Sequence, residues 1–168
     1  DKHGLAESSI GQGSVLTSPL HMALIAAAIA NHGVMMKPYM VQEIRTPGGI
    51  AISTTSPEPL AEPVTPETAR ILTSAMVKAT ISGTARAAQL PGMRVAGKTG
   101  SAENPQGPPH AWFIGFAPAD DPIAAVAVII ENGGQGGKVA APIGRALMEE
   151  TIRKYYRGVA GVDRRNSS

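Results

Sequence analysis

The chain has 168 residues, of which 15 are Lys or Arg and 13 are Asp or Glu, so its formal net charge at pH 7 is +2. A charged fraction of 17% beside 43% hydrophobic residues indicates a packed globular body and excludes a disordered chain. The absence of cysteine excludes disulfides, thiolate metal sites and a cysteine nucleophile. The length suits one domain or a large part of one.

No membrane-spanning run and no signal peptide are recognisable in the sequence. The longest apolar runs, residues 22–30 and 123–130, are far shorter than the ~20 residues that span a bilayer. A start at Asp1 without Met or a leader sequence predicts an internal fragment. Basic residues gather only near the C-terminus, where we expect a solvated helix end and no nucleic-acid partner: Arg153, Lys154, Arg157, Arg164 and Arg165.

The first third of the chain predicts a loop, a helix and a hairpin. Residues 1–17 are rich in Gly and Ser and predict a loop. Ser18 is a favourable N-cap before Pro19, and residues 20–30 are apolar almost all round, which is typical of a buried helix. Gly33 can end that helix at positive φ. An extended segment at 39–45, a Pro-Gly-Gly turn at 47–49 and a return at 50–53 then predict a hairpin.

The middle of the chain predicts a stiff linker and a second helix. Four prolines make residues 54–66 extended. Thr65 is a favourable N-cap, Pro66 suits the first helical position, and apolar residues at helical spacing continue to about residue 81.

Residues 94–131 predict a three-stranded antiparallel meander, with strands at 94–102, 111–117 and 123–131. A Pro- and Gly-rich loop is expected at 103–110, and the third strand is apolar throughout, so both of its faces should be covered. After a flexible Gly-rich loop at 132–137, we expect a C-terminal helix over about 138–157 and a flexible tail over 158–168.

Two common types of site fit the sequence poorly. A phosphate-binding loop ending at Gly137-Lys138 would need Gly at Asn132 and Ser or Thr at Val139, so a plain strand-to-helix loop is the better interpretation. The four histidines lie far apart and have no acidic partner at ligand spacing. We therefore expect no metal ion and no cofactor.

The tripeptide Lys98-Thr99-Gly100, followed by Ser101, is the strongest candidate site. It places a cation, a hydroxyl and a bare backbone position in succession on a predicted strand. An edge strand of this kind can bind a carboxylate-ended peptide as an additional strand. Because Lys98 and Thr99 would point to opposite faces, both can reach one ligand only if that ligand lies along the strand edge.

These residues belong to five segments through which the chain resembles the C-terminal part of the transpeptidase domain of penicillin-binding proteins, most closely those of class B. Lys-Thr-Gly is also a signature of the wider family that includes serine β-lactamases. The segments, in order, are Ser9-Ile-Gly-Gln-Gly-Ser14 with Thr17-Ser18-Pro-Leu20, Ala30-Asn31-His-Gly33, Lys37-Pro38, Gly97-Lys-Thr-Gly-Ser-Ala-Glu103 and His110-Ala-Trp-Phe-Ile-Gly-Phe-Ala-Pro118.

The resemblance implies an α+β fold, in which an antiparallel sheet carries flanking helices and the active site lies between the sheet and a helical lobe. It also implies peptidoglycan D,D-transpeptidase activity, in which an activated serine attacks a stem peptide ending in D-Ala–D-Ala. The acyl-enzyme then passes to an amine of a neighbouring stem, and β-lactams block the same serine. Such domains act on the extracytoplasmic face of a bacterial membrane, and any membrane anchor would lie outside this chain.

By the same resemblance, Lys98 would favour the anionic substrate terminus near the acid/base network, and Thr99 would hydrogen-bond the carboxylate. Gly100 would leave room for the acyl chain, and the backbone N–H of Ser101 would form half of an oxyanion hole. The family's Ser-x-x-Lys and Ser-x-Asn signatures are absent from this sequence. The nucleophile must therefore come from an N-terminal part of the domain that is missing from this chain, and we expect the isolated chain to be inactive.

Three other functions remain open from the sequence. A β-lactamase or a D,D-carboxypeptidase shares the Lys-Thr-Gly strand, although the segments at 9–33 and 110–118 favour a transpeptidase. A non-catalytic β-lactam sensor would bind without turning over stem peptides. The fragment alone is expected to be a folding lobe with an exposed apolar face that assembles with its N-terminal part.

Overall fold

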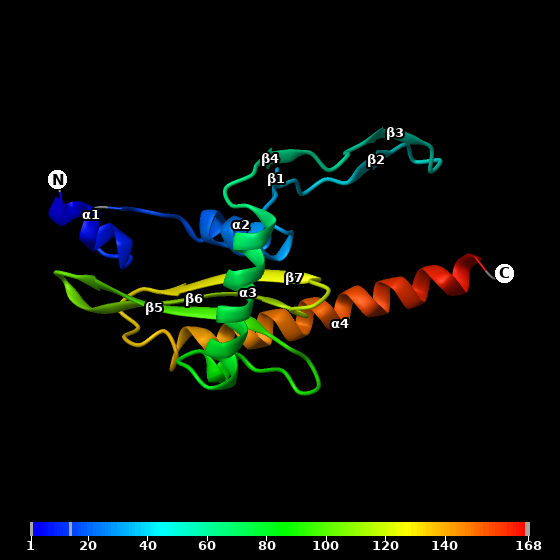
Figure 1. The fold of residues 1–168 in the computed structure, drawn as a ribbon. Coiled ribbons are helices and arrows are strands. Elements are labelled where there is room, and N and C mark those ends of the chain that lie inside the picture. Colours follow the sequence, from blue (N-terminus) through cyan, green and yellow to red (C-terminus); the bar gives the residue numbers. More distant parts are fainter. Residues whose placement is uncertain (1, 14, 167–168) are drawn as a thin grey trace.

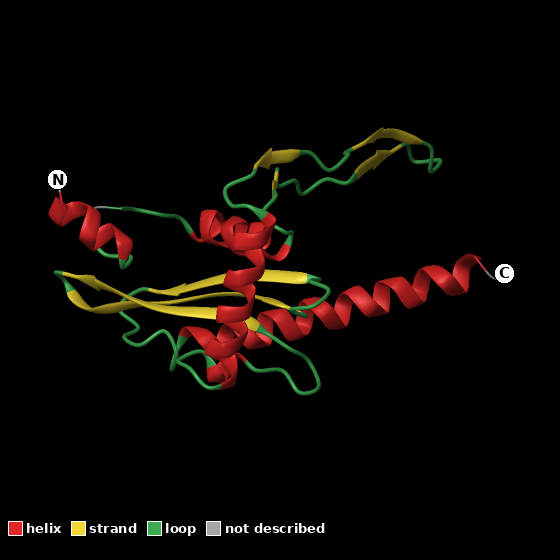
Figure 2. Ribbon diagram, viewed as in Figure 1, coloured by secondary structure: helices red, strands yellow, loops and turns green. Residues whose placement is uncertain are grey.

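The structure is a computed structural model that describes residues 2–13 and 15–166, with the side chains of residues 4–13 and 15–157. Helices and an antiparallel sheet form a mixed α+β body, from which a thin arm with short strands projects (Figure 2). The predicted fold class, an antiparallel sheet with flanking helices, is confirmed.

The centre of the body is a three-stranded antiparallel sheet in the order β5-β6-β7. Its strands are β5 (Ala96–Asn104), β6 (Gly107–Ala117) and β7 (Ala124–Ile130). Lys98 lies opposite Ile114, and Ala117 lies opposite Ala124. The predicted meander is therefore confirmed, and β5 lies at one edge of the sheet.

Helices cover both faces of this sheet, with α2 (Pro19–Ala30) on one face and α4 (Ala140–Asn166) on the other (Figure 1). Because side chains alternate along a strand, two separate cores form. Phe113 and Val128 pack with Met148 of α4, whereas Phe116 packs with Ile29 of α2. The third strand is covered on both faces, as predicted.

Helix α3 (Pro66–Ile81) crosses the edge of the sheet and packs against β5 (Figure 1). It begins as predicted, since the Thr65 side chain accepts a hydrogen bond from the N–H of Thr68 at 3.2 Å. Near its end, the buried Thr80 hydroxyl donates to the carbonyl oxygen of Val95 at 2.7 Å. This hydrogen bond fixes the start of β5 to α3. The 3-10 turn η1 (Arg86–Ala88) lies in the connection between these two elements.

The arm is formed by the residues that connect α2 to α3 in the sequence. Its base pairs β1 (Met35–Met36) with β4 (Pro59–Ala61), and its tip is the hairpin of β2 (Glu43–Arg45) and β3 (Ala51–Thr54). The predicted hairpin is confirmed. The predicted linker at 54–66 is extended but contributes the strand β4.

Two loop predictions are wrong, one at the N-terminus and one between the first two strands of the sheet. Residues 1–17 were expected to be a loop, but α1 (Lys2–Ser9) is a helix whose last serine hydroxyls, of Ser8 and Ser9, donate to the carbonyls four residues before them. The loop expected at 103–110 is largely strand, because β5 extends to Asn104 and β6 begins at Gly107.

The C-terminal helix is also longer than predicted. It continues past residue 157 to Asn166, so the tail expected at 158–168 is helical as far as the structure describes it. No residue from 158 to 165 is a proline, and the segment can therefore keep the helical hydrogen bonds. Of the expected basic cluster, Arg153 and Lys154 form ion pairs with Glu150. None of the described helices has the length and apolar character to cross a membrane.

Candidate active site

The candidate residues Lys98, Thr99, Gly100 and Ser101 all lie on β5, which in the described part of the chain pairs only with β6. The other margin of β5 is an open sheet edge. Unpaired N–H and C=O groups on such an edge are a template for an additional strand. The sequence predicted an edge strand here, and the topology contains one.

Lys98 and Thr99 point to opposite faces of the sheet, as alternation predicts. Lys98 shares its face with Ile114 and α2, and is exposed. Thr99 shares its face with Phe113 and α4, and is only 8% exposed. A single ligand can therefore meet both residues only along the edge between the two faces.

The polar atoms of these two side chains are already engaged within the chain. The Lys98 ammonium group donates to the carbonyl oxygen of Thr99, so the cation lies against the strand edge. The hydroxyl of Thr99 lies 2.7 Å from the hydroxyl of Thr84, in the loop after α3. Thr84 was missed by the sequence analysis, because a threonine in a Ser-Gly-Thr loop carries no local signal of a contact 15 residues further on.

The Gly-rich loop at 132–137 lies against the same part of β5. Its Gly136 N–H donates to the hydroxyl of Ser101 at 3.4 Å. A Cβ atom added at Gly136 would lie 2.3 Å from the carbonyl oxygens of both Gly100 and Trp112. Only glycine allows the loop to approach so closely, so this loop buttresses the site and is more than a connection to α4.

The small residues before Lys98 serve the protein's own core. Ala96 and Gly97 immediately precede Lys98 on β5. A Cβ atom at Gly97 would lie 2.7 Å from the Phe113 ring, and Ala96 is fully buried. At Gly100 the nearest neighbour of an added Cβ, the Trp112 Cβ, lies at 3.3 Å. Gly100 is thus less crowded than Gly97, although an added side chain would still be in tight contact with Trp112.

The open edge of β5 is contacted by one side chain that the sequence analysis did not single out, Gln12. Its Nε2 donates to the carbonyl oxygen of Ser101 at 3.1 Å, and its Oε1 accepts from the N–H of Glu103 at 3.2 Å. In an antiparallel ladder, alternate residues direct both main-chain groups away from the paired strand. The main-chain groups of residues 99, 101 and 103 therefore face the open edge, and the Ser101 N–H points outward from it.

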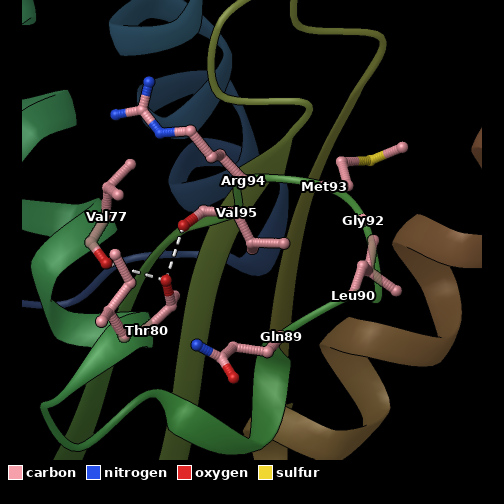
Figure 3. A pocket seen from close by; sticks show the side chains of 9 residues that line it. Val77, Thr80, Gln89, Leu90, Gly92, Met93, Arg94 and Val95 are labelled. Carbon is pink, nitrogen blue, oxygen red and sulfur yellow. Dashed lines mark hydrogen bonds between the residues drawn. The ribbon is translucent and has the colours of Figure 1, made fainter.

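Two pockets lie away from the candidate residues. One of about 190 Å³ lies beside the start of β5, where Thr80 bonds to the carbonyls of Val77 and Val95 and Arg94 flanks the segment (Figure 3). Another of about 500 Å³ is lined by α2 and residues 34–39. Neither pocket is lined by any residue of Lys98–Ser101, so the candidate site is the open edge of β5 and not a pocket.

His110, at the start of the last resemblance segment, makes a contact that connects two elements of the fold. The Nδ1 atom of His110 accepts a hydrogen bond from the N–H of Asn132 at 3.0 Å, which ties β6 to the Gly-rich loop. Among the described residues, no group of three or more His, Asp and Glu side chains is placed to hold a metal ion. Ser14 of the first resemblance segment lies outside the described residues.

Comparison with known proteins gives a consistent result. Residues 2–149 match the family described as penicillin binding protein transpeptidase domain. The chain is 45% identical over 163 residues to the peptidoglycan D,D-transpeptidase PbpA of Mycolicibacterium smegmatis, covering 92% of this chain and 33% of the relative. It is 44% identical over 162 residues to the peptidoglycan D,D-transpeptidase PbpA of Mycobacterium tuberculosis H37Rv, covering 91% of this chain and 33% of that relative.

Solved structures agree with the sequence relatives. The ceftriaxone acyl-enzyme complex of penicillin-binding protein A from M. tuberculosis superposes with a TM-score of 0.85 at 43% identity, over 90% of this chain and 36% of that chain. The penicillin G acyl-enzyme complex of the same protein superposes with a TM-score of 0.80 at 45% identity, over 90% of this chain and 36% of that chain. The chain thus spans about a third of the length of these relatives. It belongs to the penicillin-binding protein transpeptidase family, and it covers a C-terminal portion of that domain.

Proposed function

We propose that this chain supplies the substrate-docking edge of a peptidoglycan D,D-transpeptidase, and that the complete domain cross-links stem peptides through a serine acyl-enzyme. The observation that carries the proposal is the position of Lys98–Ser101 on an edge strand whose main-chain groups face outward. Relatives described as D,D-transpeptidases, and as acyl-enzymes with β-lactams, support it.

The stem peptide docks along β5 with its terminal carboxylate beside Lys98 and Thr99. The preceding carbonyl then lies at Ser101, whose N–H donates to the oxyanion that forms when the serine attacks. One such donor contributes roughly 3–4 kcal/mol to transition-state stability. The C–N bond to the terminal D-Ala breaks, and a proton passes to the leaving amine. An amine of a neighbouring stem then attacks the ester, a new amide C–N bond forms, and the C–O bond breaks to release the serine, which takes up a proton. The second oxyanion donor is the N–H of the nucleophilic serine.

The nucleophile, the acid/base groups around it and the other wall of the cleft belong to an N-terminal part of the domain that partners this chain. Neither the serine signature nor the Ser-x-Asn signature occurs in the sequence. Because cross-linked peptidoglycan lies outside the cell membrane, the complete protein acts on the extracytoplasmic face. β-Lactams enter the same edge as mimics of the peptide end.

The proposal predicts that Lys98→Ala in the complete protein slows acylation by a fluorescent penicillin by at least about a hundredfold, because an electrostatic contact at the reacting centre is typically worth that much. The acylation rate is measured by quenching the labelling reaction at successive times and quantifying the fluorescent protein on gels. Lys78→Ala, at an exposed lysine of α3, is the matched control and should acylate normally. The 168-residue chain alone should take up no label.

A wild-type acylation rate in Lys98→Ala would remove Lys98 from the mechanism, and stoichiometric labelling of the isolated chain would place the nucleophile within it. The rate at which the penicillin adduct is released from the wild-type protein separates a transpeptidase from a β-lactamase. A long-lived adduct with turnover of stem peptides supports the transpeptidase. Rapid release supports a β-lactamase, and binding without turnover supports a sensor.

A further inference from the structure

The open edge of β5 is not uniform along its length, because the Gln12 side chain covers it beyond Ser101. The primary amide of Gln12 uses its donor on the Ser101 carbonyl at 3.1 Å and its acceptor on the Glu103 N–H at 3.2 Å. Since a main-chain N–H only donates and a carbonyl only accepts, these partners fix the orientation of the amide. Gln12 therefore bonds to β5 as the main chain of a neighbouring strand would.

The segment around Gln12 is built to hold this side chain in place. Gly11 and Gly13 both have positive φ, at +77° and +84°, so the chain reverses on either side of Gln12. The N–H of Gln12 donates to the carbonyl oxygen of Glu7 at 2.9 Å, which anchors the turn to the end of α1. Gln12 itself is half-buried. These contacts hold the amide against β5 through a tight turn rather than a flexible loop.

We propose that Gln12 is a specificity-determining residue that ends the peptide-docking edge of β5 at Ser101. The inference rests on the proposed function, in which the carboxylate of the peptide lies beside Lys98 and Thr99 and its scissile carbonyl lies at Ser101. A peptide in that position runs antiparallel to β5, so its upstream residues extend toward Glu103. There they meet Gln12 instead of free main-chain groups.

As a consequence, the affinity of the site depends on the last two residues of a peptide and little on how many residues precede them. The last two residues pair with the edge between Thr99 and Ser101, and the residues before them leave the sheet. A longer peptide gains few further strand hydrogen bonds unless Gln12 is displaced. Its two bonds to β5 must then be broken, which offsets what the longer peptide gains.

The test uses the full-length protein and two defined peptides with the same end, acetyl-D-Ala-D-Ala and the same dipeptide preceded by three L-Ala residues. Dissociation constants come from NMR titration, which needs no turnover. The wild-type protein should bind both peptides with affinities within about twofold. Gln12→Ala frees the Ser101 carbonyl and the Glu103 N–H, so the longer peptide should bind about fivefold more tightly while the shorter one changes little.

Hydrogen exchange of the Glu103 amide supplies a second reading. It should be protected in the wild type, lose protection in Gln12→Ala, and keep it in Gln12→Glu, because the carboxylate still accepts from that N–H. The control is Gln106→Ala, at an exposed glutamine of the β5–β6 turn, and it should leave both readings at wild-type values.

Each outcome decides the inference. An unchanged ratio of the two affinities in Gln12→Ala, or equal weakening of both peptides, overturns it and leaves Gln12 with a merely structural role. Equal weakening with normal penicillin labelling still leaves the proposed function standing. Failure of the wild-type protein to react with penicillin overturns the proposed function but not the length preference, which the titration reads by itself. Failure of both peptides to bind overturns both.

Discussion

The hydroxyl of Thr99 is shared between the protein and its proposed substrate. In the structure it lies 2.7 Å from the hydroxyl of Thr84, and the Thr99 side chain is nearly buried. A hydroxyl can both donate and accept, so Thr84 can hold the Thr99 hydroxyl in one orientation while a carboxylate accepts from either group. Thr84 is thus the nearest support of the proposed carboxylate contact.

This arrangement predicts a measurable coupling between Thr84 and Thr99. Thr84→Val keeps the shape of the side chain but removes the hydrogen bond, and should lower the free energy of unfolding by about 1 kcal/mol. A double-mutant cycle with Thr99→Val, followed by urea unfolding, should give an interaction energy of about 0.5–1.5 kcal/mol. Strictly additive effects of the two substitutions would show that the two hydroxyls do not interact.

At the scale of single residues, the sequence predicted the residues on the edge but not their supports. Lys98, Gly100 and Ser101 follow from a short motif read on a strand. Thr84, Gln12 and Gly136 come from three separate segments and meet at β5 only because the chain folds. Hydrogen bonds between residues 89 or 35 positions apart leave no local periodicity in a sequence.

At the scale of elements, strong capping signals gave accurate boundaries. Helix α3 starts at Pro66, directly after the predicted N-cap Thr65, and α2 starts at Pro19 after Ser18. The loop expected at 103–110 was wrong because its prolines suggested irregular backbone. Pro108 and Pro109 lie in a part of β6 that precedes the first pair with β7, Ala111 with Ile130. A strand with one neighbour tolerates proline there, since a missing N–H can face outward.

The cap of α3 gives a prediction at this scale. Thr65→Ala removes the acceptor for the Thr68 N–H and should lower the free energy of unfolding by about 1 kcal/mol. Ser56→Ala, in the exposed segment before β4, is the control and should stay within about 0.5 kcal/mol of the wild type. Equal unfolding midpoints for the two variants in urea would show that the cap does not stabilise α3.

At the scale of the whole molecule, many large apolar side chains are exposed to solvent. The expectation that α2 is buried is only partly met, because Leu20 at its start is 60% exposed. Other large apolar side chains in the N-terminal half are at least half exposed: Leu5, Ile10, Val15, Leu16, Met40, Val41, Ile44, Ile50, Ile52 and Leu60. Sequence periodicity identifies an apolar face but not the polypeptide that covers it.

This exposure predicts self-association of the isolated chain, because exposed large apolar side chains are stabilised when they pack against another molecule. In sedimentation velocity at micromolar concentration, the chain should sediment as dimers or larger species and bind an apolar dye. A substitution such as Leu16→Ser should reduce the association, whereas Ser56→Ala should not. A monodisperse monomer without dye binding would contradict this prediction.

The central claim is that the open edge of β5 accepts a peptide end in the complete domain. Hydrogen exchange of the full-length protein before and after reaction with penicillin tests it most directly, read at the amides of residues 96–104. We predict that acylation slows exchange at Ser101, whose N–H then donates to the bound carbonyl, while even-numbered residues already bonded to β6 change little. Full acylation with unchanged exchange along β5 would contradict the account.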